Sequence, residues 1–146
     1  MKDYAVILVL FVIGFFIDGV VVATEIHTFP LLSVGKHVEL TANIVLPKGQ
    51  KLNKGAPSNI TVLEKLGVEW QVVEKINLND YFTLTEDFKV NKKLQLNSEN
   101  SNLKIRASLY HCDKIKNNFC VIDDFEGEIK RTTSAKNTVF EFDLKG

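Results

Sequence analysis

Two cysteines, Cys112 and Cys120, are the residues of this 146-residue chain whose type and spacing could do chemistry. Both lie in the segment YHCDKIKNNFC, with seven residues between them. Such a pair can form a structural disulfide, exchange with the thiols of a partner protein, or bind a metal ion together with His111. The function that the sequence indicates depends mainly on which of these three roles the cysteine pair has.

A hairpin would bring the two cysteines together. Cys112 ends an alternating apolar and polar stretch, Cys120 begins the short apolar run CVI, and a polar segment containing asparagine connects them. Facing positions of a hairpin lie within reach of a disulfide. Since these are the only two cysteines, we expect them to be joined in a mainly structural bond.

A redox-active pair is the alternative. His111 and Lys114 could supply positive charge near the sulfurs, although a strand neighbour such as His111 points to the opposite face. A metal site is disfavoured, because zinc takes four ligands and no second cluster of ligands accompanies Cys112, Cys120 and His111.

The N-terminus has the layout of a signal peptide. Lys2 is followed by an apolar run that Asp18 interrupts, and the small residue Ala23 follows shortly after. The run is shorter than the roughly 20 residues of a spanning helix. We expect cleavage after Ala23, a single mature domain over residues 24–146, a secreted or secretory-lumen location and no stable membrane insertion. Export also favours disulfide formation, and makes Asn59, in the triplet NIT, a candidate glycosylation site.

No other segment resembles a catalytic site. The motifs of serine hydrolases, zinc proteases and phosphate-binding loops are absent, and we expect no cofactor and assign no catalytic residue. His27 and His37 stand alone. A group of carboxylates after Cys120 is typical of a solvated turn: Asp123, Asp124, Glu126 and Glu128. The zero formal net charge and the lack of a basic stripe argue against nucleic-acid binding.

Alternation with a period of two predicts strands throughout the mature chain. The clearest segments are 37–47, 59–63, 68–73, 102–112 and 139–144, with weaker candidates at 78–84, 92–97 and 120–122. Short strands between turn signals predict an all-β, immunoglobulin-like antiparallel β-sandwich. The expected core residues are Leu40, Ile44, Trp70, Leu103, Ile105, Leu109, Phe140 and Phe142.

Two motifs carry a family resemblance. The segment NIVLPKGQKLNKGAPS followed by a later tyrosine-containing strand with paired cysteines resembles the C-terminal β-stranded domain of the NHL-repeat-containing protein 2 family. The matching positions are Leu46, Pro47, Gly49, Leu52, Ala56, Pro57, Ser58, Leu109, Tyr110, Cys112 and Cys120.

The cysteine segment also resembles, more distantly, the amino-terminal immunoglobulin-like domain of the bacterial thiol:disulfide interchange protein DsbD, through Tyr110, Cys112, Phe119 and Cys120. That resemblance implies a redox-active pair acting with a thioredoxin-like partner. The chain departs from the bacterial motif in its wider cysteine spacing and in Val121 and Ile122, which replace prolines.

Two functions therefore remain open. The first is a secreted, non-catalytic β-sandwich that binds an unknown protein partner and carries a structural disulfide. The second is a thiol–disulfide oxidoreductase module that uses Cys112 and Cys120 with a thioredoxin-like protein. Both hypotheses use the same fold, so the fold alone does not decide between them.

Overall fold

The computed structural model describes residues 25–26, 31–81, 87–115 and 119–146. The expected signal peptide, residues 1–23, and His27 lie outside the described residues. Within the described part of the chain, no helix has the length and apolar character needed to cross a bilayer.

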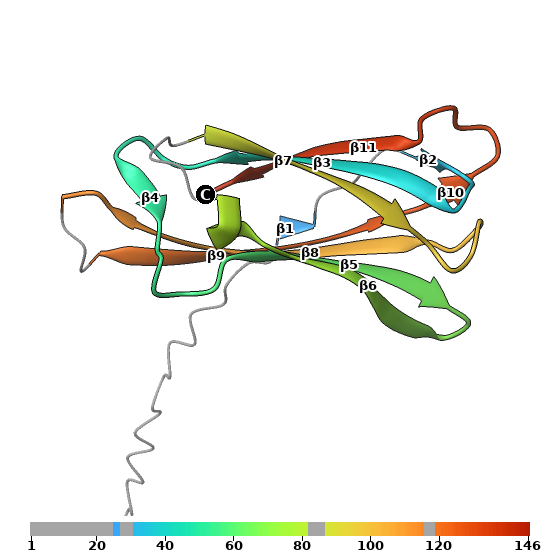
Figure 1. Cartoon of the computed structure of the whole chain (residues 1–146), viewed down its shortest axis with the longest axis horizontal. Coiled ribbons are helices and arrows are strands. Elements are labelled where there is room, and N and C mark those ends of the chain that lie inside the picture. The colour runs from blue at the N-terminus through green and yellow to red at the C-terminus, as the bar shows by residue number, and fades with distance from the viewer. Residues whose placement is uncertain (1–24, 27–30, 82–86, 116–118) are drawn as a thin grey trace, which may run out of the picture.

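The larger of two facing sheets is built around one long strand, β8 (Figure 1). Strand β8 pairs with β9 along one edge, while β5 and the short strand β4 share its other edge. The sheet order is β1 (Glu25–Ile26), β9 (Cys120–Ile129), β8 (Leu103–Asp113), β5 (Asn59–Leu66) and β6 (Glu69–Asn77), with β4 (Gln50–Leu52) beside the end of β8.

The second sheet lies over the first and has β3 at its centre (Figure 1). Its order is β11 (Val139–Lys145), β3 (His37–Val45) and β7 (Asp87–Gln95). Strand β7 runs antiparallel to β3, whereas β11 runs parallel to it. A separate short pair is formed by β2 (Leu32–Ser33) and β10 (Arg131–Thr132). The predicted all-β sandwich, with mostly antiparallel pairing, is confirmed.

Alternation along the strands fills the core between the sheets, because successive side chains point to opposite faces. In β8 the inward residues are aliphatic up to Leu109, and β3 and β11 supply the facing layer. Seven of the expected core residues are confirmed as buried: Leu40, Ile44, Leu103, Ile105, Leu109, Phe140 and Phe142.

Trp70 was wrongly expected in the core. It is only half-buried, and it pairs with Lys65 on the outer face of the larger sheet. The Nζ atom of Lys104 lies 4.5 Å from its ring centroid, and that of Lys65 lies 5.8 Å away. The ring is therefore covered by cationic side chains and not by the opposite sheet.

The strand expected over residues 78–84 is also wrong in its first part. Residues Leu78–Tyr81 form a 3-10 helix, η1, and residues 82–84 are not described. Asn77 Oδ1 accepts the backbone N–H of Asn79 at 3.1 Å. Such a local side-chain bond competes with strand pairing and favours a tight turn.

A buried carboxylate fixes the connection between β7 and β8. Glu64 is fully buried, and its oxygens accept hydrogen bonds from the backbone of Asn97 and Ser98 and from Ser101 Oγ. Burial, the largest single influence, raises the pKa of Glu64, but the bonds from Ser101, Asn97 and Ser98 together bring that pKa below its usual value. The folded protein therefore holds Glu64 as a carboxylate.

We predict that Glu64→Gln lowers the free energy of unfolding by about 1–3 kcal/mol at neutral pH, because the new amide group faces donors. The folded-state pKa of Glu64 is lower than the unfolded one. The stabilisation that Glu64 gives the fold is therefore complete above about pH 4.3, the pKa of an unfolded glutamate. It is lost as the pH falls through the folded-state pKa. Urea denaturation at pH 7 and pH 3 checks this, with exposed Glu69→Gln as the control. An equal loss of unfolding free energy at pH 7 and at pH 3 would contradict this prediction.

Candidate functional site

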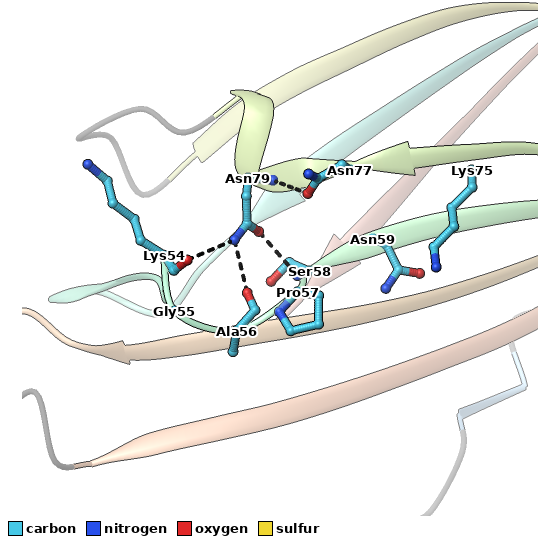
Figure 2. A pocket seen from close by; sticks show the side chains of 9 residues that line it. All are labelled: Lys54, Gly55, Ala56, Pro57, Ser58, Asn59, Lys75, Asn77 and Asn79. Carbon is cyan, nitrogen blue, oxygen red and sulfur yellow. Dashed lines mark hydrogen bonds between the residues drawn. The ribbon is translucent and has the colours of Figure 1, made fainter.

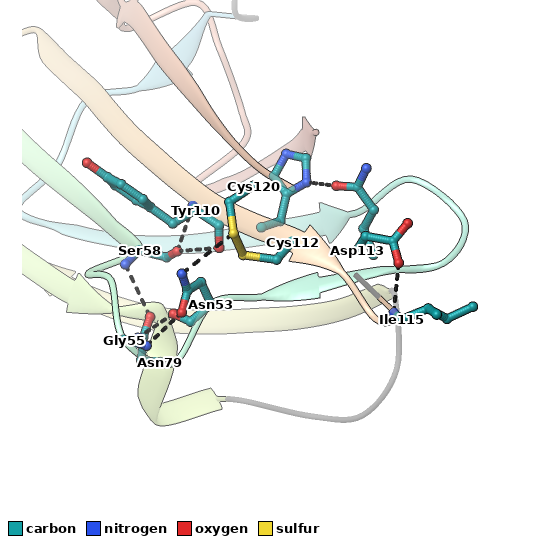
Figure 3. Close-up of a disulfide and its surroundings, with 11 residues drawn as sticks. Asn53, Gly55, Ser58, Asn79, Tyr110, Cys112, Asp113, Ile115 and Cys120 are labelled. Carbon is teal, nitrogen blue, oxygen red and sulfur yellow. Dashed lines mark hydrogen bonds between the residues drawn. A yellow bond between two sulfur atoms is a disulfide. The ribbon is translucent and has the colours of Figure 1, made fainter. Parts of the chain in front are cut away.

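The two cysteines form a disulfide across the end of the β8–β9 hairpin (Figure 3). Cys112 of β8 lies directly opposite Cys120 of β9 in the strand register, with a Cα–Cα distance of 4.0 Å and an S–S bond of 2.03 Å. Cys112 is only 4% exposed, whereas Cys120 is an exposed residue. The pairing expected from the sequence is confirmed, and only one of its two residues is open to solvent.

Hydrogen bonds hold the described residues beyond the disulfide, on both sides of residues 116–118. The N–H of Asp113 donates to the carbonyl of Phe119 at 3.1 Å, and Asp113 Oδ1 accepts the N–H of Ile115 at 2.7 Å. The N–H of Lys114 donates to the carbonyl of Gly49 at 2.9 Å, which joins the tip to the β3–β4 turn. Gly49 has a φ of 84°, a conformation that favours glycine.

Two asparagines hold the loop of residues 53–58 against the disulfide (Figure 3). Asn53 Nδ2 lies 3.9 Å from Cys120 Sγ, and its Oδ1 accepts the N–H of Gly55 at 2.8 Å. Asn79 Nδ2 donates to the carbonyl of Ala56 at 2.9 Å. Sequence reasoning missed these roles. Asparagine followed closely by glycine was the available signal, because such pairs often form side-chain turns.

His111 does not face the sulfurs. It lies on the inner face of β8, only 2% exposed, whereas Cys112 lies on the outer face. Its Nε2 is 2.5 Å from Asp123 Oδ2, and its Nδ1 contacts Gln50 Oε1. His111 therefore links β4, β8 and β9 behind the disulfide, while the side chain of Lys114 is exposed at the tip.

The carboxylates after Cys120 were wrongly assigned to a turn. All four lie on β9, where inward Phe125 and Ile129 alternate with outward acidic side chains. Arg106 Nε donates to Glu126 at 2.7 Å, and Ser108 Oγ donates to Asp124 at 2.5 Å. The bond from Arg106 is the main reason why the pKa of Glu126 is below its usual value. Apart from Asp123, this is a paired, solvent-facing surface, and Glu128 is exposed.

Asn59 stands at the rim of a polar hollow of about 510 Å³ (Figure 2). The hollow is bounded by the 54–58 loop, Asn59, Lys75, Asn77 and Asn79. Asn59 is half-buried at the start of β5, and its Oδ1 accepts a 3.4 Å hydrogen bond from Thr61 Oγ1. The glycosylation expected at Asn59 stays a prediction.

His37 is exposed at the start of β3, far along the chain from the cysteines. Among the described residues, no group of three or more histidine, cysteine, aspartate or glutamate side chains could hold a metal ion.

No known protein family matches the chain, and none of the curated proteins is detectably similar to it in sequence. The resemblances to the NHL-repeat-containing protein 2 family and to DsbD stay predictions. The disulfide and the surface around it are therefore the features from which a function can be inferred.

Proposed function

We propose that the chain is an exported, non-catalytic protein-interaction module whose contact surface is the tip of the β8–β9 hairpin. The observation that carries this is the exposure of three large apolar side chains beside the disulfide. Ile115 is 92% exposed, Phe119 64% and Ile122 48%. We call these three residues the tip surface.

The disulfide and the backbone bonds of Asp113 and Lys114 hold the strand ends that carry the tip surface. Ile122 pairs with Tyr110 on the same outer face as the two cysteines, two residue pairs from the disulfide on the side away from the hairpin turn. Ile115 points away from the body of the domain (Figure 3). Large apolar side chains left exposed beside one another in the chain mark interaction sites. The disulfide therefore serves as a staple that presents an apolar tip to a protein with a complementary apolar groove.

We predict that a photo-reactive side chain at position 119 crosslinks to one defined protein in the native setting. The matched control is the same group at position 68. Val68 is equally apolar and 92% exposed, but it lies at the β5–β6 turn, at the other end of the sandwich (Figure 1). The crosslink at 119 should disappear when Ile115 and Ile122 are changed to serine. Equal crosslinking from both positions, or a crosslink that survives the serine changes, would refute the tip surface as the docking site.

Export accounts for the formation of the bond, because a nearby cysteine pair is oxidised outside the cytosol. We predict that the protein recovered outside its cells begins at Thr24 and carries a glycan on Asn59. One intact-mass measurement detects both the N-terminus and the glycan. Thr61→Val is the control for the glycan, because it removes the acceptor triplet. Chains that still contain Met1 would contradict export with cleavage, and an unmodified mass would contradict the glycan.

Thiol–disulfide exchange is the second candidate, and the unequal exposure of the two cysteines supports it. A partner thiolate would attack the exposed Cys120 Sγ, the Cys112–Cys120 bond would break, and Cys112 would leave as a thiolate. The second thiol of a thioredoxin-like partner would then displace Cys120, so that the partner ends as a disulfide and this chain as a dithiol. In total, two electrons and two protons pass from the two thiols of the partner to this chain.

The stability of the double variant Cys112→Ser with Cys120→Ser and the rate at which thioredoxin reduces the wild type together separate the two candidates. As a staple, the bond closes a short loop, so its loss should lower the free energy of unfolding by about 2–3 kcal/mol and leave the sandwich folded. In the wild type, thioredoxin should reduce the bond slowly while the fold is intact. Rapid reduction, together with capture of a thioredoxin lacking its second active-site cysteine through Cys120, would favour exchange over the staple.

A further inference from the structure

We propose that Asn53 is a positioning residue for the disulfide. Its side-chain amide is held against Cys120 Sγ and stabilises the thiolate that forms there when the bond is reduced. The inference concerns the chemistry of the bond itself and depends on neither candidate function.

The orientation of the Asn53 side chain is fixed by its other contacts. Its Oδ1 accepts the backbone N–H of Gly55 at 2.8 Å, so the opposite end of the amide, Nδ2, is the end that faces Cys120 Sγ at 3.9 Å. A flipped amide would place two N–H donors, those of Asn53 and Gly55, against each other.

The backbone of Asn53 is held equally firmly. Its N–H donates to the carbonyl of Tyr110 at 2.7 Å, two residue pairs from the disulfide, and its carbonyl accepts a hydrogen bond from Asn79 Nδ2 at 3.3 Å. Four hydrogen bonds or contacts therefore place the amide beside the exposed sulfur, as Figure 3 shows. The donor does not have to be ordered when the sulfur becomes charged.

The amide favours one redox state over the other. A disulfide sulfur is a weak acceptor, but a thiolate is a charged acceptor whose hydrogen bonds are roughly twice as strong. Reduction by two glutathione molecules breaks the Cys112–Cys120 bond and yields two protein thiols and one glutathione disulfide. Because the Asn53 bond strengthens only in the reduced protein, Asn53 shifts this balance toward the dithiol and makes Cys120 ionise at lower pH.

Asn53→Asp is the sharpest test, since it preserves size and the acceptor for Gly55 but places a carboxylate oxygen at the sulfur. In a Cys112→Ser background, the alkylation rate of Cys120 with iodoacetamide is followed against pH. We expect Asn53→Asp to raise the pH at which half of Cys120 is ionised and to slow the alkylation of Cys120 at neutral pH by about tenfold. In the chain with both cysteines, the equilibrium with glutathione should shift about tenfold toward the disulfide.

Two controls separate this role from charge and from loop packing. Asn100→Asp makes the same charge change at an exposed position in the β7–β8 connection. Asn79→Ala loosens the same loop without adding charge. Asn100→Asp should leave the pH midpoint of Cys120 close to that of the parent chain, and Asn79→Ala, which removes one of the bonds that hold Asn53, should shift it by a smaller factor than Asn53→Asp. A shift with Asn79→Ala equal to that with Asn53→Asp would reduce Asn53 to a structural role.

Asn53→Ala keeps the proposal falsifiable if the aspartate variant does not fold. It removes the donor without adding charge, so it should shift both measurements in the same direction by a smaller factor. An alanine variant that matches the parent chain in both measurements would overturn the proposal.

Discussion

The pairing of β8 with three other strands is the constraint on which the rest of this structure depends. Its register with β9 places Cys112 opposite Cys120, and its register with β5 brings Leu103 beside Glu64. Strand β4 joins only at the last residues of β8, so it lies beside the disulfide. A slip of one residue would turn the inward side chains of β8 outward and separate the cysteines. The same hydrogen-bonded pairing of β8 with its neighbours therefore determines both the sandwich core and the candidate site.

The two faces of β8 give neighbouring residues different environments. Cys112 lies on the outer face beside the Asn53 loop, while His111 is buried behind it between Gln50 and Asp123. Buried polar groups need partners, and His111 has one at each ring nitrogen. The bonds of His111 fasten β4 and β9 to β8 on the inside, and the disulfide fastens β8 to β9 on the outside. The tip surface is consequently carried on a hairpin end that is held from both faces.

Sequence alternation predicted the sandwich, most of its core and the cysteine pairing, because the period of two and the closeness of the cysteines are local features. It could not tell which face of β6 is inward, so Trp70 was misplaced on the far side of the sheet. The strand signal of β9 was weak because Gly127 interrupts its inward row. The contact of Asn53 with Cys120 joins residues 67 positions apart, and burial of Glu64 depends on donors from a distant loop. Neither leaves a local pattern in the sequence.

The reduction potential of the Cys112–Cys120 bond tests the staple most directly. Equilibration of the folded protein in redox buffers of known potential, with the free thiols counted by mass after alkylation, measures it. A structural staple in an exported protein predicts a value below about −300 mV. A value in the range of glutaredoxins, about −200 to −230 mV, would contradict the staple and make exchange the function of the pair.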